Sequence, residues 1–89
     1  MAKDGRRTQA ERAAETRDAL IGAARPLFAS VGFADASLET IVRYAGVTRG
    51  ALYHHFADKT ELFAAVFERV EAEMAALRGV APAAGAAVT

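Results

Sequence analysis

The sequence has 89 residues, no cysteine, and equal numbers of basic and acidic side chains, with 11 Lys/Arg and 11 Asp/Glu. A chain of this length folds as one small domain, and the missing cysteine excludes disulfides, thiolate zinc sites and a cysteine nucleophile. Its N-terminus lacks the apolar stretch of a signal peptide, and no apolar run approaches the roughly 20 residues of a membrane span. We therefore expect a soluble cytoplasmic protein with no membrane partner.

The predicted hydrophobic core is small. Hydrophobic residues make up 53% of the chain, but alanine supplies nearly half of them and buries little apolar surface. The core is therefore predicted to consist of the larger side chains Leu20, Ile21, Leu27, Phe28, Val31, Phe33, Leu38, Ile41, Val42, Val47, Leu52, Phe56, Leu62, Phe63, Val66, Phe67 and Val70.

Composition divides the chain into three segments. Residues 1–8 are polar and basic and are predicted to form a flexible arm, whose Arg6 and Arg7 either enter a minor groove or keep the terminus soluble. Residues 9–78 are predicted to form the folded domain. Residues 79–89, rich in alanine and glycine, are predicted to be a disordered tail because they have nothing to bury.

Apolar residues at helical spacing, together with capping signals, divide residues 9–78 into four predicted helices. The helices are expected to span Gln9–Val31, Leu38–Ala45, Arg49–Phe56 and Lys59–Arg78. Their N-caps are predicted at Thr8, Ser37, Thr48 and Asp58, of which the first and the last precede a glutamate at capping-box spacing. Gly32 is expected to end the first helix, and Pro26 is expected to kink that helix near Gly22.

The two short helices are joined by a tight turn at Gly46 and Val47, with a long helix on either side. This is the layout of a DNA-binding helix-turn-helix. Gly46 stands where a left-handed backbone is needed, and the apolar residues that hold the two short helices at their crossing are Ile41, Ala45, Val47 and Leu52. On spacing alone, an ordinary helical hairpin remains the alternative.

The outward face of the third helix favours DNA binding over that alternative. At about 100° per residue, Gly50, Ala51 and His54 point away from the core. Small side chains let the backbone approach the floor of a groove, where Arg49 at the helix entrance is expected to reach a guanine edge.

Tyr53, His55 and Lys59 flank this face and are expected to contact phosphates on the groove walls. The adjacent His54 and His55 point about 100° apart and have no further ligand in a suitable register, so no metal site is expected. No nucleophile motif or buried acid–base pair is visible in the sequence, and we expect neither an enzyme nor a cofactor.

The run GVTRGALYHHFADKTELF closely resembles the N-terminal domain of TetR-family transcriptional regulators. It is preceded by Leu27, Phe28, Gly32 and Phe33 in an LF-x-x-x-GF pattern, and the resemblance covers about Thr16 to Val70. The resemblance implies an all-α fold, with a three-helix helix-turn-helix head and the start of a fourth, linking helix. It also implies a repressor that binds a palindromic double-stranded operator on the nucleoid as a homodimer.

The resemblance assigns roles to individual residues. It implies that bases are read by Arg49, Gly50 and Ala51, with His54 at a variable position that touches base or backbone. It implies phosphate contacts by Tyr53, His55 and Lys59, and caps with phosphate contacts by Ser37 and Thr48.

The sequence departs from the family pattern in side-chain size and in length. Val42 is larger than the usual residue at the helix crossing and is expected to open or strain it, and the bulky Tyr44 is expected to point outward or toward the first helix. Family members join this head to a larger domain that binds an effector and forms the dimer. We therefore expect a fragment or a free-standing head, without a small-molecule site or a dimer domain.

Two functions stay open at this point. The first is sequence-specific DNA binding as a regulator, which predicts salt-dependent binding to duplex DNA. The second is an interaction module that pairs through the fourth helix with a full-length relative and modulates it without binding DNA well itself. Met74 and Leu77 have no predicted neighbour to cover them, which is the feature that suggests such pairing.

Overall fold

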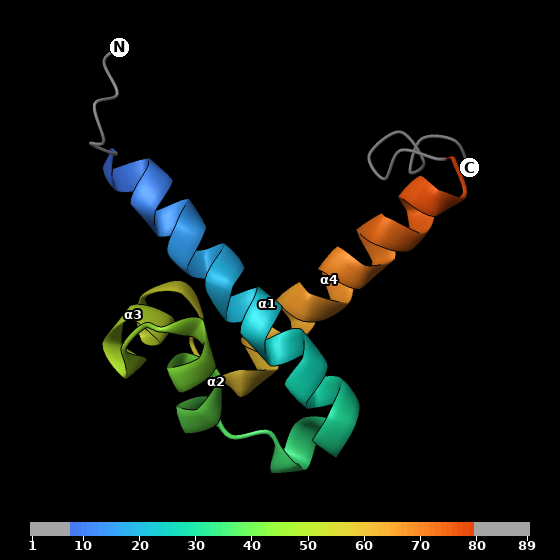
Figure 1. Ribbon diagram of the computed structural model, residues 1–89. Coiled ribbons are helices and arrows are strands. Elements are labelled where there is room, and N and C mark those ends of the chain that lie inside the picture. Colours follow the sequence, from blue (N-terminus) through green and yellow to red (C-terminus); the bar gives the residue numbers. More distant parts are fainter. Residues whose placement is uncertain (1–7, 80–89) are drawn as a thin grey trace.

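The computed structural model describes residues 8–79, which form four helices and no strand. The helices are α1 (Gln9–Asp35), α2 (Leu38–Ala45), α3 (Arg49–His55) and α4 (Lys59–Leu77). The N-terminal half of α1 and the C-terminal half of α4 diverge as the arms of a V, and α2 and α3 pack against α1 below the crossing (Figure 1). Within this part of the chain, no helix is long and apolar enough to cross a bilayer.

The all-α class and the order of the helices are as predicted from the sequence. The segments predicted as a basic arm and a disordered tail lie, apart from residues 8 and 79, outside the described residues. The bounds of α2 agree with the sequence prediction, and α3 and α4 each end one residue earlier than predicted. Local signals therefore define the helices well.

Both ends of α1 follow from local sequence. The backbone N–H of Thr8 donates to Oε1 of Glu11 at 3.0 Å, and the N–H of Glu11 donates to Oγ1 of Thr8 at 3.0 Å, so the predicted capping box is confirmed. Gly32 has φ 85° and ψ 167° and interrupts the helix where its end was predicted. One further turn follows, closed by a hydrogen bond of 3.1 Å from the N–H of Ala36 to the carbonyl of Gly32.

One local prediction is wrong in part and another stays a prediction. Gly32 is the residue within α1 whose backbone angles are non-helical, and those angles do not test the bend expected near Gly22. Pro26 and Gly22 are both exposed, so water can satisfy the carbonyl that the proline leaves free. At the start of α4, Asp58 accepts from the N–H of Glu61 at 2.9 Å, but Glu61 accepts from Ala57 at 2.8 Å and not from the cap itself.

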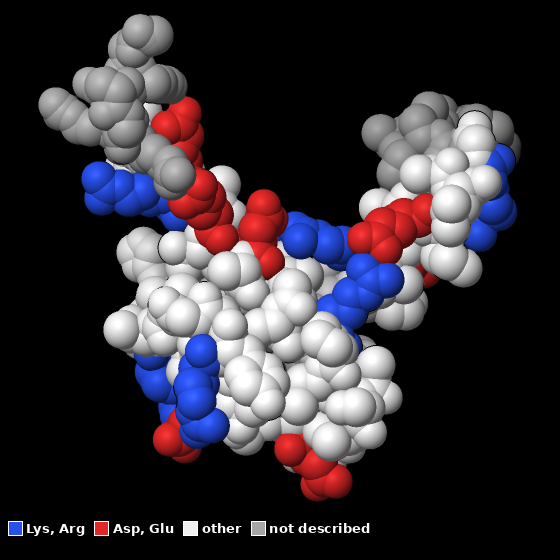
Figure 2. All heavy atoms as spheres, in the orientation of Figure 1, with Lys and Arg blue, Asp and Glu red and all other residues white. Residues whose placement is uncertain are grey.

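Two ion pairs join the long helices where the arms of the V separate. Arg25 lies 2.8 Å from Glu73, and Arg69 lies 2.6 Å from Asp18. Figure 2 shows acidic and basic side chains alternating across the angle between the arms. Because all four side chains are substantially exposed, each pair contributes at most about 1 kcal/mol, but together they favour one direction of α4 relative to α1.

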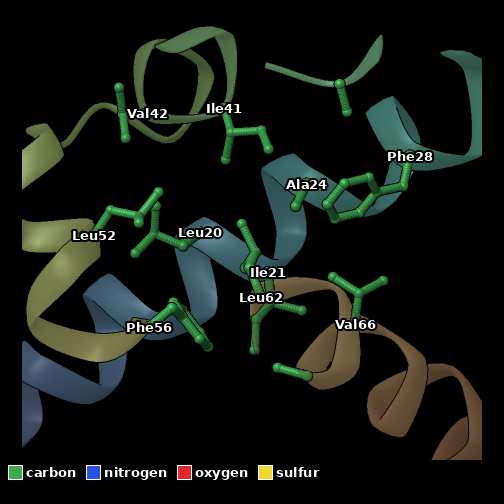
Figure 3. Packing of buried hydrophobic residues seen from close by; sticks show 12 residues of the cluster. Leu20, Ile21, Ala24, Phe28, Ile41, Val42, Leu52, Phe56, Leu62 and Val66 are labelled. Atoms are coloured by element: carbon green, nitrogen blue, oxygen red, sulfur yellow. The ribbon is translucent and has the colours of Figure 1, made fainter. Parts of the chain in front are cut away.

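Side chains from all four helices meet in one core (Figure 3). Its buried members are Leu20, Ile21, Ala24, Phe28, Ala36, Ile41, Val42, Leu52, Phe56, Leu62, Ala65 and Val66. Val42, larger than the family pattern at the crossing, is accommodated as one of these buried residues, whereas Tyr44 is 69% exposed. Ala24, Ala36 and Ala65 were not predicted in the core, yet each is at most 7% exposed.

Four residues predicted in the core are exposed instead. The exposed fraction of their surface lies between 39% and 53% for Val31, Phe33, Phe63 and Phe67. The apolar stripe of α4 is wider than the surface that α1 offers it, so Leu62 and Val66 fill the contact while their neighbours remain at its edge. Phe33 and Phe63 still pack edge to face at 5.5 Å between ring centroids.

Candidate nucleic-acid interface

The turn between α2 and α3 is built on one left-handed residue. Gly46 has φ 74° and ψ 29°, and its N–H donates to the carbonyl of Arg43 at 3.2 Å. The N–H of Val47 donates to the carbonyl of Val42 at 3.1 Å, which completes a Schellman motif. The chain then passes directly into Thr48, the N-cap of α3. The predicted glycine turn is confirmed.

The inner face of α3 is fixed to the body. Leu52 has 0% and Phe56 has 3% of its surface exposed. At the start of α3, Oγ1 of Thr48 accepts from the N–H of Ala51 at 3.0 Å. A short helix that is anchored in this way presents its opposite face in a defined orientation.

The outer face of α3 carries the side chains predicted to read bases. Arg49, Gly50 and His54 are exposed, and Ala51 is half-buried. A Cβ added to Gly50 would meet only Oγ1 of Thr48, at 3.8 Å, which is an ordinary contact. The space in front of Gly50 is therefore open, and the backbone there forms the lowest part of this face.

Arg49 and Tyr53 form a pair along this face. A guanidinium nitrogen of Arg49 donates to the phenol oxygen of Tyr53 at 3.2 Å, and the guanidinium carbon lies 5.6 Å from the centre of its ring. Stacking and the hydrogen bond restrict the rotamers of a long side chain. The phenol accepts in this pair, so its own proton remains available to a further acceptor such as a phosphate.

The N-terminal part of α1 extends this surface. Arg12, Thr16, Ala51, His54 and His55 border an open groove of about 250 Å³ between α1 and α3. Arg12 was not a predicted site residue, because it is distant in sequence and only the fold brings it beside the histidines. A basic side chain at the rim adds positive charge to this groove.

The two histidines differ in their surroundings. Their ring centroids lie 5.6 Å apart, with His54 exposed and His55 half-buried. Burial lowers the pKa of His55 below its ordinary value of 6.5, and the charges of His54 and Arg17 lower it further. Among residues 8–79, no group of three or more His, Asp or Glu side chains is arranged to hold a metal ion.

Ser37 and Thr48 are the exposed N-caps of α2 and α3. Oγ of Ser37 accepts from the N–H of Thr40 at 3.0 Å and donates to its hydroxyl, also at 3.0 Å. Each cap is therefore held by its own helix. The two hydroxyls stand at the helix entrances, where a phosphate contact was predicted.

Lys59 differs from Arg49, Ser37 and Thr48 because its hydrogen bonds reach a distant segment of the chain. Nζ donates to the carbonyls of Phe33 at 2.7 Å, Ala36 at 3.0 Å and Ala34 at 3.3 Å. It also lies 4.6 Å from the centre of the Phe33 ring. The phosphate contact predicted for Lys59 is not tested by this arrangement, but the structure gives its charge a partner in the fold.

Charge is unevenly distributed over the molecule. Basic side chains lie over α2 and α3 on the face shown in Figure 2, and a largely uncharged surface adjoins them. The basic residues of these two helices are Arg43 and Arg49, both exposed. The exposed Glu39 of α2 offsets one of these charges, and the chain as a whole is neutral.

Known proteins share this sequence and fold. The transcriptional repressor BepR of Brucella suis is 50% identical over 64 residues, which are 72% of this chain and 30% of BepR. The transcriptional regulator AcrR of Shigella flexneri is 43% identical over 72 residues, which are 81% of this chain and 33% of AcrR. The chain thus spans about a third of the length of these relatives.

A crystal structure of a TetR-family transcriptional regulator from Pectobacterium atrosepticum matches the fold with a TM-score of 0.63 at 51% sequence identity. The match covers 76% of this chain and 35% of that one. The profile of the bacterial regulatory proteins of the tetR family matches residues 20–66, which include the whole of α2, the turn and α3. The chain therefore belongs to the TetR family of transcriptional regulators, a non-enzymatic family, and carries its helix-turn-helix DNA-binding domain.

Proposed function

We propose that the chain binds double-stranded DNA at a specific sequence, with α3 in the major groove, as the head of a transcriptional repressor. The observation that carries this proposal is the outer face of α3, where Arg49, the bare backbone of Gly50 and His54 are exposed on a helix anchored by buried residues. A relative at 50% identity, BepR, is named a transcriptional repressor, which supports the direction of regulation.

Bases are read from the N-terminal end of α3. Arg49 reaches a guanine through its two-pronged guanidinium, a contact that discriminates between base pairs by about 1–3 kcal/mol. Gly50 and Ala51 let the backbone come close to the groove floor. His54, one turn later on the exposed face, touches a base or the backbone next to it.

Phosphates are contacted from both sides of that helix. Tyr53 keeps its phenol proton free to donate, and His55 lies at the groove that α1 borders. Ser37 and Thr48 place hydroxyls at the entrances of α2 and α3. These contacts fix the orientation of α3 on the duplex and do not read its sequence.

One copy of α3 makes one set of contacts. A regulator that reads a palindromic operator uses two such heads on half-sites about one helical turn apart, so we propose a homodimer as the operator-bound form. The 89-residue chain acting as a monomer is expected to bind weakly, with a dissociation constant of roughly 10⁻⁴ to 10⁻⁶ M for its preferred duplex and a larger one for a scrambled duplex.

The test is duplex selection followed by a salt titration with the full 89-residue chain. Fluorescence anisotropy with the selected duplex and a scrambled one is expected to show preference for the selected duplex. Affinity for both should fall as salt rises, because phosphate contacts release counterions. Equal affinity for both duplexes at every salt concentration, or no binding at all, would refute the proposal.

The exposed apolar side chains of α4 favour a second candidate function. Phe67, Met74 and Leu77 are 53%, 49% and 82% exposed, as expected for a helix that pairs with another chain. In that case the chain is an interaction module that pairs with a full-length relative and modulates it. Concentration-dependent association in sedimentation, without affinity for any duplex, would favour this second function over the first.

A further inference from the structure

The N-terminal part of α1 projects beyond the core. The first buried residue of α1 is Leu20, so no side chain from Gln9 to Ala19 is fully buried. At 1.5 Å per residue, this stretch of helix is about 16 Å long. Figure 1 shows that it leaves the body above α3, with which α1 is in contact. The side chains of this stretch are therefore not committed to the core.

One side of this stretch faces α3. Gln9, Arg12, Ala13 and Thr16 follow the helical spacing i, i+3, i+4 and i+7, and they border the open groove of about 250 Å³ whose opposite side includes His54. Ala13 and Thr16 are half-buried, whereas Arg12 is exposed. Arg12 therefore brings a cation from α1 to a groove that also borders the candidate base-reading face of α3.

The guanidinium of Arg12 differs from those of the other arginines on the long helices near it. Arg25 and Arg69 form ion pairs, and Arg17 lies over the ring of Phe56, 5.3 Å from its centre. Within residues 8–79, no hydrogen bond or ion pair engages Arg12. Its five N–H donors, whose planar fork matches the oxygens of a phosphate, are therefore open to an outside acceptor.

The nearby carboxylates do not occupy this groove. Glu11 accepts from the backbone N–H of Thr8 in the capping box. Neither Glu11 nor Glu15 is among the described residues that border the groove. An anion that enters beside Arg12 would therefore meet the cation and the two histidines, and no acidic side chain of the groove lining.

We propose that Arg12 contacts a phosphate of the DNA backbone, across the groove from His54 and His55, and so extends the DNA-binding surface from α3 onto α1. The inference rests on the proposed function, in which the outer face of α3 fills the major groove. A side chain that borders α3 from a neighbouring helix then meets the wall of that groove, where the phosphates lie. Arg12 is outside residues 20–66, so this contact adds to those of the shared helix-turn-helix.

The first test is a salt titration of Arg12→Ala with the selected and the scrambled duplex. Loss of one phosphate contact should lower the salt slope by about 0.9 and the affinity for both duplexes by about eightfold in 0.1 M salt. The variant should fold, because Arg12 is exposed and alanine is a strong helix former. Arg78→Ala removes the same charge at the C-cap of α4 and should bind as the wild-type chain does. An unchanged salt slope for Arg12→Ala would overturn the inference.

A second variant separates a defined contact from net charge. Arg12→Ala combined with Ala14→Arg keeps the charge of the chain but moves the guanidinium about 200° around α1, to another exposed position. We expect this double variant to bind as weakly as Arg12→Ala alone. Recovery of the wild-type affinity would show that only the charge matters, and would overturn the proposed contact.

A third experiment locates the phosphate. Each phosphate of the selected duplex is replaced in turn by an uncharged methylphosphonate. At the contacted position the wild-type chain should lose affinity, while Arg12→Ala should lose nothing further, because both changes remove the same interaction. If no such position exists and the effect of Arg12→Ala follows the A·T content of the flanking duplex, Arg12 enters a minor groove and the inference is wrong.

Failure of this inference and failure of the proposed function give different results. If the wild-type chain shows no preference for the selected duplex, the proposed function fails. If that preference is present but Arg12→Ala binds like Arg78→Ala, the inference alone fails.

Discussion

The substitution Gly50→Ala should change the stability of the protein and its affinity for DNA in opposite directions. The added methyl carbon would meet Oγ1 of Thr48 at 3.8 Å, so nothing in the free protein has to move. Alanine is favoured over glycine within a helix by about 0.5–1 kcal/mol. The variant should therefore melt at the wild-type temperature or up to about 8 °C above it.

The same methyl group should weaken DNA binding. If the backbone at Gly50 lies against the groove floor, the extra volume costs about 1–3 kcal/mol, as in a tightly packed core. The matched control is Gly22→Ala, at an exposed position of α1 where an added Cβ meets nothing within 4 Å. That control should gain similar stability and keep its affinity.

Circular-dichroism melting and anisotropy titrations with the selected duplex measure the two effects in the same preparations. The reasoning is refuted if Gly50→Ala binds DNA as tightly as Gly22→Ala. In that case, the backbone of α3 does not approach the duplex closely at Gly50.

Three further predictions follow from the contacts described. Arg49→Ala should reduce the discrimination at one base pair by about 1–3 kcal/mol, whereas Tyr53→Phe should weaken binding to all duplexes by about 1 kcal/mol with little change in salt dependence. Competition with singly substituted duplexes measures both effects, and a reversal of these roles would contradict the assignment. Phe28→Ala should lower the free energy of unfolding by about 3–5 kcal/mol, while substitution of the exposed Phe67 by alanine should lower it far less. Equal losses in chemical denaturation would place Phe28 outside the core. Burial and neighbouring cations lower the pKa of His55 below 6.5, so the unfolded chain binds the imidazole proton more tightly than the folded chain does. Neutral His55 therefore contributes to the free energy of unfolding above pH 6.5, and this contribution is lost as the pH falls through the lowered pKa. Denaturation across this range should show less loss for His55→Gln than for the wild-type chain, and identical curves would contradict the assignment.

The sequence predicted those features that depend on neighbouring residues. The capping box at Thr8 and the left-handed Gly46 each involve residues within a few positions, so their geometry follows from local chemistry. The inward direction of Leu52 and Phe56 follows from helical periodicity. Most of the candidate face of α3 was therefore predictable.

Features that depend on the approach of distant segments were not predictable in this way. Periodicity marks a broad apolar stripe on α4, but only the packing of α1 decides that Leu62 is buried and Phe67 is exposed. The carbonyl partners of Lys59 and the place of Arg12 beside the histidines also depend on the fold. Buried alanines such as Ala24 escape a prediction based on side-chain size.

The most direct test of the central claim is an NMR titration of the full 89-residue chain with the selected duplex and with a scrambled one. We expect the amide signals of α3 and of the residues around Ser37 to shift most, and to shift in different directions for the two duplexes. Signals in the C-terminal half of α4, around Met74, should move little. Shifts concentrated around Met74, with those of α3 unchanged, would contradict the claim that α3 reads DNA.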